Sequence, residues 1–137
     1  FINIAKKTGA KVSVASATKL PFKNNSMDIV LCTETLEHIK QWEKAVSEIK
    51  RVLKPHGRAI ITVPLEKSFF WKLFSIIYNP EKTRGHVSLV TATDIEKEFA
   101  PMKIKKKQFI QTSSITLNKI LPRSEKISMY AFFIFQK

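Results

Sequence analysis

The chain has 137 residues, the size of one domain, and 44% of them are hydrophobic, which excludes wholesale disorder. Lys and Arg number 24 against 11 Asp and Glu, and the formal net charge of +13 favours contact with nucleic acid, an anionic membrane surface or anionic substrates without choosing among them. The single cysteine, Cys32, excludes an intrachain disulfide, and the most apolar stretch, residues 68–78, is too short to span a bilayer. We therefore expect a cytoplasmic protein that is at most peripheral to a membrane.

The first third of the chain predicts one helix end and two strands. Residues 1–9 have the pattern of the last turns of an amphipathic helix closed by Gly9. Residues 11–15 alternate and are rich in β-branched side chains, which predicts a strand. After a loop marked by Pro21, the apolar run at 28–32 is typical of a strand buried on both faces of a parallel sheet.

The middle of the chain predicts a helix followed by a strand. Apolar residues recur at helical period between Trp42 and Leu53, and basic residues occupy the last turns, where they favour the negative end of the helix dipole. Pro55 and Gly57 end this helix. Residues 58–63 then form a second apolar run, which predicts another buried strand.

The last part predicts two helices and two strands. Residues 68–78 are expected to form a short apolar helix that packs in the core, covers an acceptor or rests on a membrane. Residues 91–99 have a helix pattern with a cap at Thr91 and Asp94 three positions later. Strands are expected at 102–110, with a solvated lysine face, and at 127–135. The alternation predicts an α/β sheet with helices on both faces and an antiparallel last strand.

Three stretches in fixed order carry a family resemblance: VASATKLPFKNNSMDIVLCTETLEHI, AVSEIKRVLKPHGRAIITVP and RGHVSLVTATDIEKEF. Together the motifs resemble the class I, S-adenosylmethionine-dependent methyltransferases of the methyltransferase-11 type. The resemblance implies a Rossmann-like sheet and makes residues 1–137 a single, partial domain of this class. Because the match begins after the family's second strand, we expect a C-terminal portion that lacks the glycine-rich cofactor motif and is inactive by itself.

The resemblance also implies where S-adenosylmethionine binds. Ser16 stands where relatives often have an acidic residue for the adenine, and its hydroxyl can accept a weaker hydrogen bond than a carboxylate. The Ala17 amide faces the adenine ring, and Cys32 and Thr33 lie beside the methionine end. We expect Cys32 to be a small buried hydrophobe rather than a nucleophile.

The stretch TETLEHI, residues 33–39, concentrates polar groups directly after a buried strand. If it is helical, Glu34, Glu37 and His38 share one face and could bind Mg²⁺ or a transition metal, with His86 as a fourth ligand. The spacing is similar to the metal-binding pattern of ubiquinone-pathway O-methyltransferases and small-RNA 2′-O-methyltransferases. Two other interpretations stay open: the carboxylates only favour the helix dipole, or His38 lines the pocket as a catalytic general base.

The intact protein is accordingly expected to be an enzyme that methylates a small, lipophilic acceptor with S-adenosylmethionine, and with Mg²⁺ as a second candidate cofactor. The high positive charge leaves an RNA 2′-O-type methyltransferase as an alternative. A second alternative is a non-catalytic remnant that acts as a partner-binding or membrane-associated module.

Overall fold

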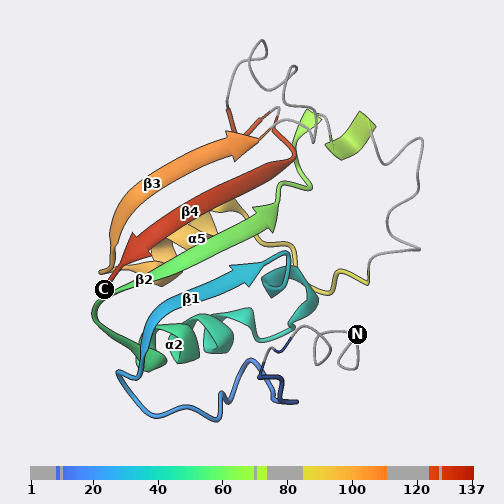
Figure 1. Cartoon of the computed structure of the whole chain (residues 1–137). Helices are drawn as coiled ribbons and strands as arrows, with labels where there is room; N and C mark the ends of the chain where they lie inside the picture. The colour runs from blue at the N-terminus through green and yellow to red at the C-terminus, as the bar shows by residue number, and fades with distance from the viewer. Residues whose placement is uncertain (1–8, 10, 70, 74–84, 111–123, 127) are drawn as a thin grey trace.

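The computed structural model describes residues 9, 11–69, 71–73, 85–110, 124–126 and 128–137, and its described strands form one mixed sheet (Figure 1). The strand order is β1-β2-β4-β3, in which β1 and β2 are parallel and β4 is antiparallel to both of its neighbours. The elements are β1 (Met27–Thr33), the 3-10 helix η1 (Leu36–His38), α2 (Trp42–Val52), β2 (Leu53–Pro64), α5 (Ala92–Phe99), β3 (Lys103–Ile110) and β4 (Tyr130–Gln136). This topology confirms the expected Rossmann-like α/β sheet and its antiparallel last strand.

The core lies between one face of the sheet and the two α-helices. Side chains of β2 and β4 alternate between this face and the opposite one, as strand geometry requires. On the helix side, Phe99 of α5 stacks on Phe135 of β4 with ring centroids 4.3 Å apart. On the opposite side, Ile29 and Leu31 of β1 are 60% and 65% exposed. Within the described residues, α2 and α5 therefore cover the same face of the sheet.

The junction between α2 and β2 explains why the sequence signals a helix end there. Met27 of β1 pairs with Leu53, and the next paired residue, Ile29, pairs with Arg58, so residues 54–57 bulge out of the ladder. His56 has a positive φ of 66°. A Cβ on Gly57 would lie 2.9 Å from the Lys54 carbonyl oxygen and 3.1 Å from that of Asp28, which only glycine avoids.

Several expected elements are confirmed and others are corrected. The helix after Thr91 forms with a complete capping box, because the Thr91 hydroxyl accepts from the Asp94 amide and the Asp94 carboxylate accepts from the Thr91 amide. The expected strand at 11–15 is wrong: these residues form no ladder, and only an isolated bridge joins Ser16 to Lys19.

The helix that would place Glu34, Glu37 and His38 on one face does not form, because Glu34 adopts a positive φ of 46° and, within residues 33–39, only η1 is helical. In the expected helix at 68–78, residues 69 and 71–73 are helical, and most of the others lie outside the described part, as do residues 1–8. None of the helices described is both long and apolar enough to cross a membrane.

Candidate functional site

Polar side chains gather where the parallel strands β1 and β2 end. Chain segments that follow these strands meet at one sheet edge, the position where open α/β sheets bind ligands. The segment after β1 supplies Glu37 and His38, the segment after β2 supplies Glu66, and the segment before α5 supplies His86. Three separate segments thus bring four titratable groups to one edge.

Glu37, His38 and His86 form the centre of this group. One ligand atom from each lies within 4.8 Å of the others, and the His38 and His86 rings meet edge to face with centroids 4.7 Å apart. Nε2 of His38 is 3.8 Å from a Glu37 carboxylate oxygen. The expected closeness of these three residues is therefore present.

Backbone hydrogen bonds hold the His86 segment against η1. The amides of Val87 and Ser88 both donate to the Glu37 carbonyl, at 2.9 and 3.0 Å, and the Ser88 hydroxyl donates to the Ile39 carbonyl at 3.0 Å. Nδ1 of His38 lies 3.2 Å from the Gly85 carbonyl oxygen. These hydrogen bonds fix where His86 lies relative to Glu37, although the two residues are far apart in the sequence.

Further side chains pack around His86. Its Nδ1 is hydrogen-bonded to the Glu66 carboxylate. The ring of Trp71, which is 5% exposed, stacks against His86 with centroids 6.0 Å apart, and Tyr130 meets Trp71 edge to face at 6.5 Å. An aromatic wall therefore lies beside the polar cluster.

The Glu37 side chain stands out electrostatically. It is 1% exposed, and neither carboxylate oxygen accepts a hydrogen bond from another residue that the structure describes. Burial raises the pKa of Glu37, while its own backbone hydrogen bonding and the two nearby imidazoles lower it. Buried carboxylates are normally paired, so this one is set up to meet a cation or a hydrogen-bond donor.

An apolar cavity of about 190 Å³ lies next to the end of β1. Ala17 and Cys32, both expected at a cofactor site, line it together with Leu20, Val30, Leu31, Thr35, Leu36, Ala45 and Ile49. Burial raises the pKa of the Cys32 thiol to about 11, which keeps it neutral and unreactive as expected. The volume is below the roughly 300–1,000 Å³ of whole ligand pockets, so it suits one ring of a larger ligand.

Charged residues of α2 hold the loop before β1, which forms the other side of this cavity. Glu48 accepts a hydrogen bond from the Leu20 amide at 2.7 Å, and Arg51 binds Glu48 while donating to the carbonyls of Leu20 and Phe22. The Arg51 side chain lowers the pKa of Glu48 to about 2. This network keeps Ala17 and Leu20 against β1 although no regular element precedes them in the described chain.

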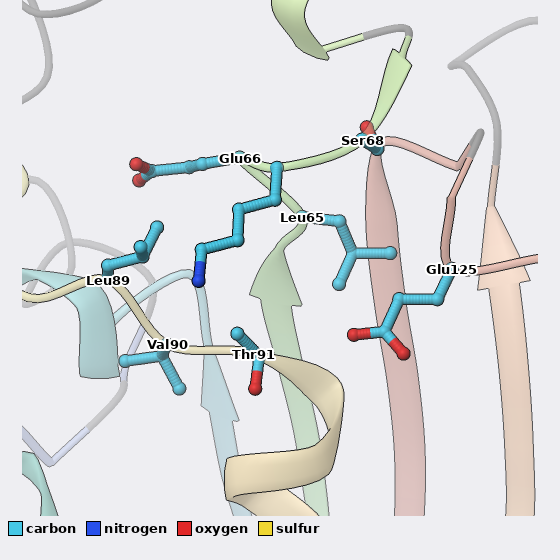
Figure 2. Close-up of a pocket in the computed structure, with 8 residues that line it drawn as sticks. Leu65, Glu66, Ser68, Leu89, Val90, Thr91 and Glu125 are labelled. Atoms are coloured by element: carbon cyan, nitrogen blue, oxygen red, sulfur yellow. The ribbon is translucent and has the colours of Figure 1, made fainter.

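A smaller cavity of about 40 Å³ lies beyond Glu66, with room for a few water molecules. Figure 2 shows Thr91 and Glu125 at this cavity and the Glu66 carboxylate extending away from Leu65. Glu66 thus lies between the small cavity and His86, to which it is bonded.

The other expected site residues lie elsewhere. Thr33 and Ser16 do not line the apolar cavity; the Thr33 carbonyl accepts from the Thr35 hydroxyl, and the Ser16 hydroxyl bonds that of Thr18. The Glu34 carboxylate accepts a hydrogen bond from the Thr62 hydroxyl at 2.9 Å and is not part of the three-residue cluster.

Sequence reasoning missed Glu66 and Thr35. A signal for Glu66 was available, since it stands two residues after the last residue of a strand that ends at the ligand edge. Thr35 follows the same rule for β1. No local pattern indicates the pairing of Glu66 with His86, because 20 residues separate them.

A family model described as a methyltransferase domain matches residues 1–61. An uncharacterised protein of Methanocaldococcus jannaschii is 29% identical over 85% of this chain and 57% of its own length. A ubiquinone/menaquinone biosynthesis C-methyltransferase of Chromobacterium violaceum is 40% identical over 50% of this chain and 27% of its own length. The chain therefore spans less than two thirds of these relatives.

Among solved structures, the chain is similar to a methyltransferase of Thermotoga maritima that is described as a possible histamine N-methyltransferase. The similarity covers 98% of this chain and 68% of the Thermotoga chain. The TM-score is 0.75 at 18% sequence identity. Identity this low shows a shared fold and nothing finer.

Proposed function

We propose that this protein, which belongs to the class I, S-adenosylmethionine-dependent methyltransferases, methylates a small acceptor at the edge where β1 and β2 end. One observation carries the proposal: an apolar cavity lined by Ala17 and Cys32 lies at the same sheet edge as a cluster of carboxylates and imidazoles. The first suits a planar ring of the methyl donor, and the second suits the acceptor and its proton.

The residues of the cavity fit the donor chemically. S-adenosylmethionine, when bound, supplies an electrophilic methyl group on a positively charged sulfur. The cavity lining carries no charged side chain, so an uncharged ring would meet only apolar groups, the Cys32 thiol and the Thr35 hydroxyl. Because the Cys32 pKa is about 11, its neutral thiol is a weak nucleophile and does not compete with the acceptor for the methyl group. Ser16 and Thr33 are the sequence neighbours of the lining residues Ala17 and Cys32, and we propose that they lie at the rim of this site.

Methyl transfer requires a lone pair on the acceptor and a place for its proton. The lone pair forms a bond to the methyl carbon while the carbon–sulfur bond breaks, leaving its electron pair on sulfur. An acceptor O–H or N–H must give up its proton. His38 is placed to handle that proton, because its side chain is 41% exposed and the Gly85 carbonyl orients its ring through Nδ1.

The acceptor we propose is small and has a lipophilic part. Phe69 and Leu73 provide exposed apolar surface, and Trp71 of the same segment is buried against His86 and Tyr130. The Chromobacterium relative, by its name, acts in quinone biosynthesis. A quinone-like molecule is the type of acceptor that this apolar surface would accommodate.

Titration of S-adenosylhomocysteine into the intact protein, followed by calorimetry, tests the proposal. We expect binding in the wild type and at least a tenfold loss, about 1.4 kcal/mol, in Ala17→Trp, whose indole would fill the apolar cavity. Val14→Trp is the matched control: Val14 is 84% exposed on the same loop, so its affinity should not change. No binding to the wild type, or equal binding by all three proteins, would contradict the proposal.

A further inference from the structure

The loop before β1 forms one wall of the apolar cavity although it has no regular structure. Ala17 and Leu20 line the cavity, and neither residue lies in a helix or a strand. A segment of this kind gains no order from a hydrogen-bond ladder, so other contacts must hold the wall in place. Two charged side chains of α2 supply such contacts.

The Arg51 guanidinium makes most of these contacts. Its five N–H groups make five hydrogen bonds, two to the Glu48 carboxylate and three to oxygens of the loop. The three loop oxygens are the carbonyls of Leu20 and Phe22, at 3.1 and 2.8 Å, and the side-chain oxygen of Asn24, at 2.8 Å. One planar group therefore holds three points of the loop at once.

The Glu48 carboxylate links this guanidinium to the cavity wall. Its Oε2 accepts from the Leu20 amide at 2.7 Å and from Arg51 at 2.8 Å. Glu48 thus holds the N–H of Leu20 while Arg51 holds its carbonyl. The Glu48 and Arg51 side chains are 18% and 31% exposed, so solvent screens the pair less than it screens a fully exposed one.

The helix that carries this pair also contributes directly to the cavity, through Ala45 and Ile49. Glu48 and Arg51 do not line the cavity and act on it through Leu20. We propose that these two are positioning residues, which hold the loop in the shape that accepts the methyl donor and thereby set the affinity for it. The inference rests on the proposed function, because it assumes that the donor binds in the apolar cavity.

The geometry of the contacts requires arginine at position 51. Lysine would keep the positive charge and has a similar helix propensity, but its ammonium group lacks the planar fork and has only three donors. It cannot bind the Glu48 carboxylate and the three loop oxygens together. In Arg51→Lys the loop would adopt other positions, and the donor would bind only the fraction of molecules whose wall is in place.

Calorimetric titration of S-adenosylhomocysteine into intact Arg51→Lys tests the proposal. We expect roughly 10-fold weaker affinity than in the wild type, the loss when about one molecule in ten has the loop in place. Hydrogen exchange of the Leu20 amide, which is bonded to Glu48, should become faster while exchange within α2 stays unchanged. Exchange thus distinguishes positioning from overall stability, because a general loss of stability would also expose the amides of α2.

Glu48→Gln is the second variant, and circular dichroism shows whether each variant folds. It keeps an oxygen for the Leu20 amide but removes the charge that attracts Arg51, so its affinity should also fall below that of the wild type. Failure of both variants to fold would show that the pair supports the whole domain rather than the loop. That result would overturn the proposal.

Lys54→Gln is the matched control. Lys54 follows α2 and makes an ion pair with Asp28 at 2.8 Å, and neither residue lines the cavity. This variant removes an ion pair from the same region and should bind S-adenosylhomocysteine like the wild type. Wild-type affinity in Arg51→Lys, or an equal loss in Lys54→Gln, would overturn the positioning role.

The two measurements separate this inference from the proposed function. Wild-type protein that does not bind S-adenosylhomocysteine contradicts the proposed function, whatever the exchange rates are. Wild-type protein that binds it, with a Leu20 amide that exchanges equally fast in the wild type and in Arg51→Lys, contradicts only the positioning role.

Discussion

Replacing Glu37 by methionine should stabilise the metal-free protein, although it alters a buried residue. The side chain is 1% exposed and its oxygens have no hydrogen-bond partner among the described residues. Leaving a buried polar group unsatisfied costs about 1–3 kcal/mol, and methionine has a similar length without that penalty. After allowing for imperfect packing, we expect the free energy of unfolding to rise by about 1–2 kcal/mol.

The gain should depend on pH in a definite direction. Because burial raises the folded-state pKa of Glu37 above its unfolded value, the folded state holds the proton more tightly. The contribution of Glu37 to the free energy of unfolding is therefore present below its pKa in the unfolded state and is lost as pH rises through its pKa in the folded state. The advantage of Glu37→Met should therefore be largest at neutral pH and shrink in mild acid.

Thermal unfolding in the presence of a chelator measures this effect, since 1 kcal/mol shifts Tm by roughly 2–8 °C for domains of 60–250 residues. Glu66→Met is the matched control: its carboxylate is bonded to His86, so the same replacement should lower Tm. If Glu37→Met instead destabilises the protein as Glu66→Met does, the Glu37 oxygens have partners in the folded state and the reasoning about the site fails.

Three further predictions concern other parts of the fold. The Cys32 pKa of about 11, against an ordinary 9.0, should slow its alkylation near pH 8 by about 100-fold relative to a free thiol, and a rate near that of free cysteine would contradict its burial. The Arg51 side chain lowers the Glu48 pKa from 4.5 to about 2, so the Glu48–Arg51 pair stabilises the fold above pH 4.5, and this stabilisation is lost as pH falls toward 2. Acid unfolding of Glu48→Gln should lack this contribution, and identical acid-unfolding curves for the variant and the wild type would contradict the prediction. Thr91→Ala should lose about 1 kcal/mol of stability in denaturant unfolding while Thr91→Ser retains most of it, because only the serine keeps the capping hydroxyl; equal losses would show that the cap contributes nothing.

Periodicity and local signals were enough for the regular elements near the core. The apolar stripe of α2 and the Thr91–Asp94 cap of α5 depend on residues within a few positions, and both elements formed where expected. No strand formed at 11–15, where one was expected. Alternating β-branched residues indicate only that a segment suits a pleated surface, whereas a strand also needs a neighbouring strand with which to pair.

The site was predictable only in part, for a related reason. Glu37 and His38 were chosen from residue type and their position after a strand, and His86 because its loop was expected to return to the same face of the sheet. The three residues do meet. Glu34 was misplaced because its positive φ breaks the helix on which the shared face depended. The Glu66–His86 pair arises from two loops that only the folded sheet brings together, and no pattern within either loop indicates it.

A crystal structure of the protein with S-adenosylhomocysteine would show directly where the methyl donor binds. We expect the adenine ring in the cavity between Ala17 and Cys32, with the sulfur toward the edge that holds His38. Adenine bound elsewhere, or a sulfur atom directed away from that edge, would contradict it.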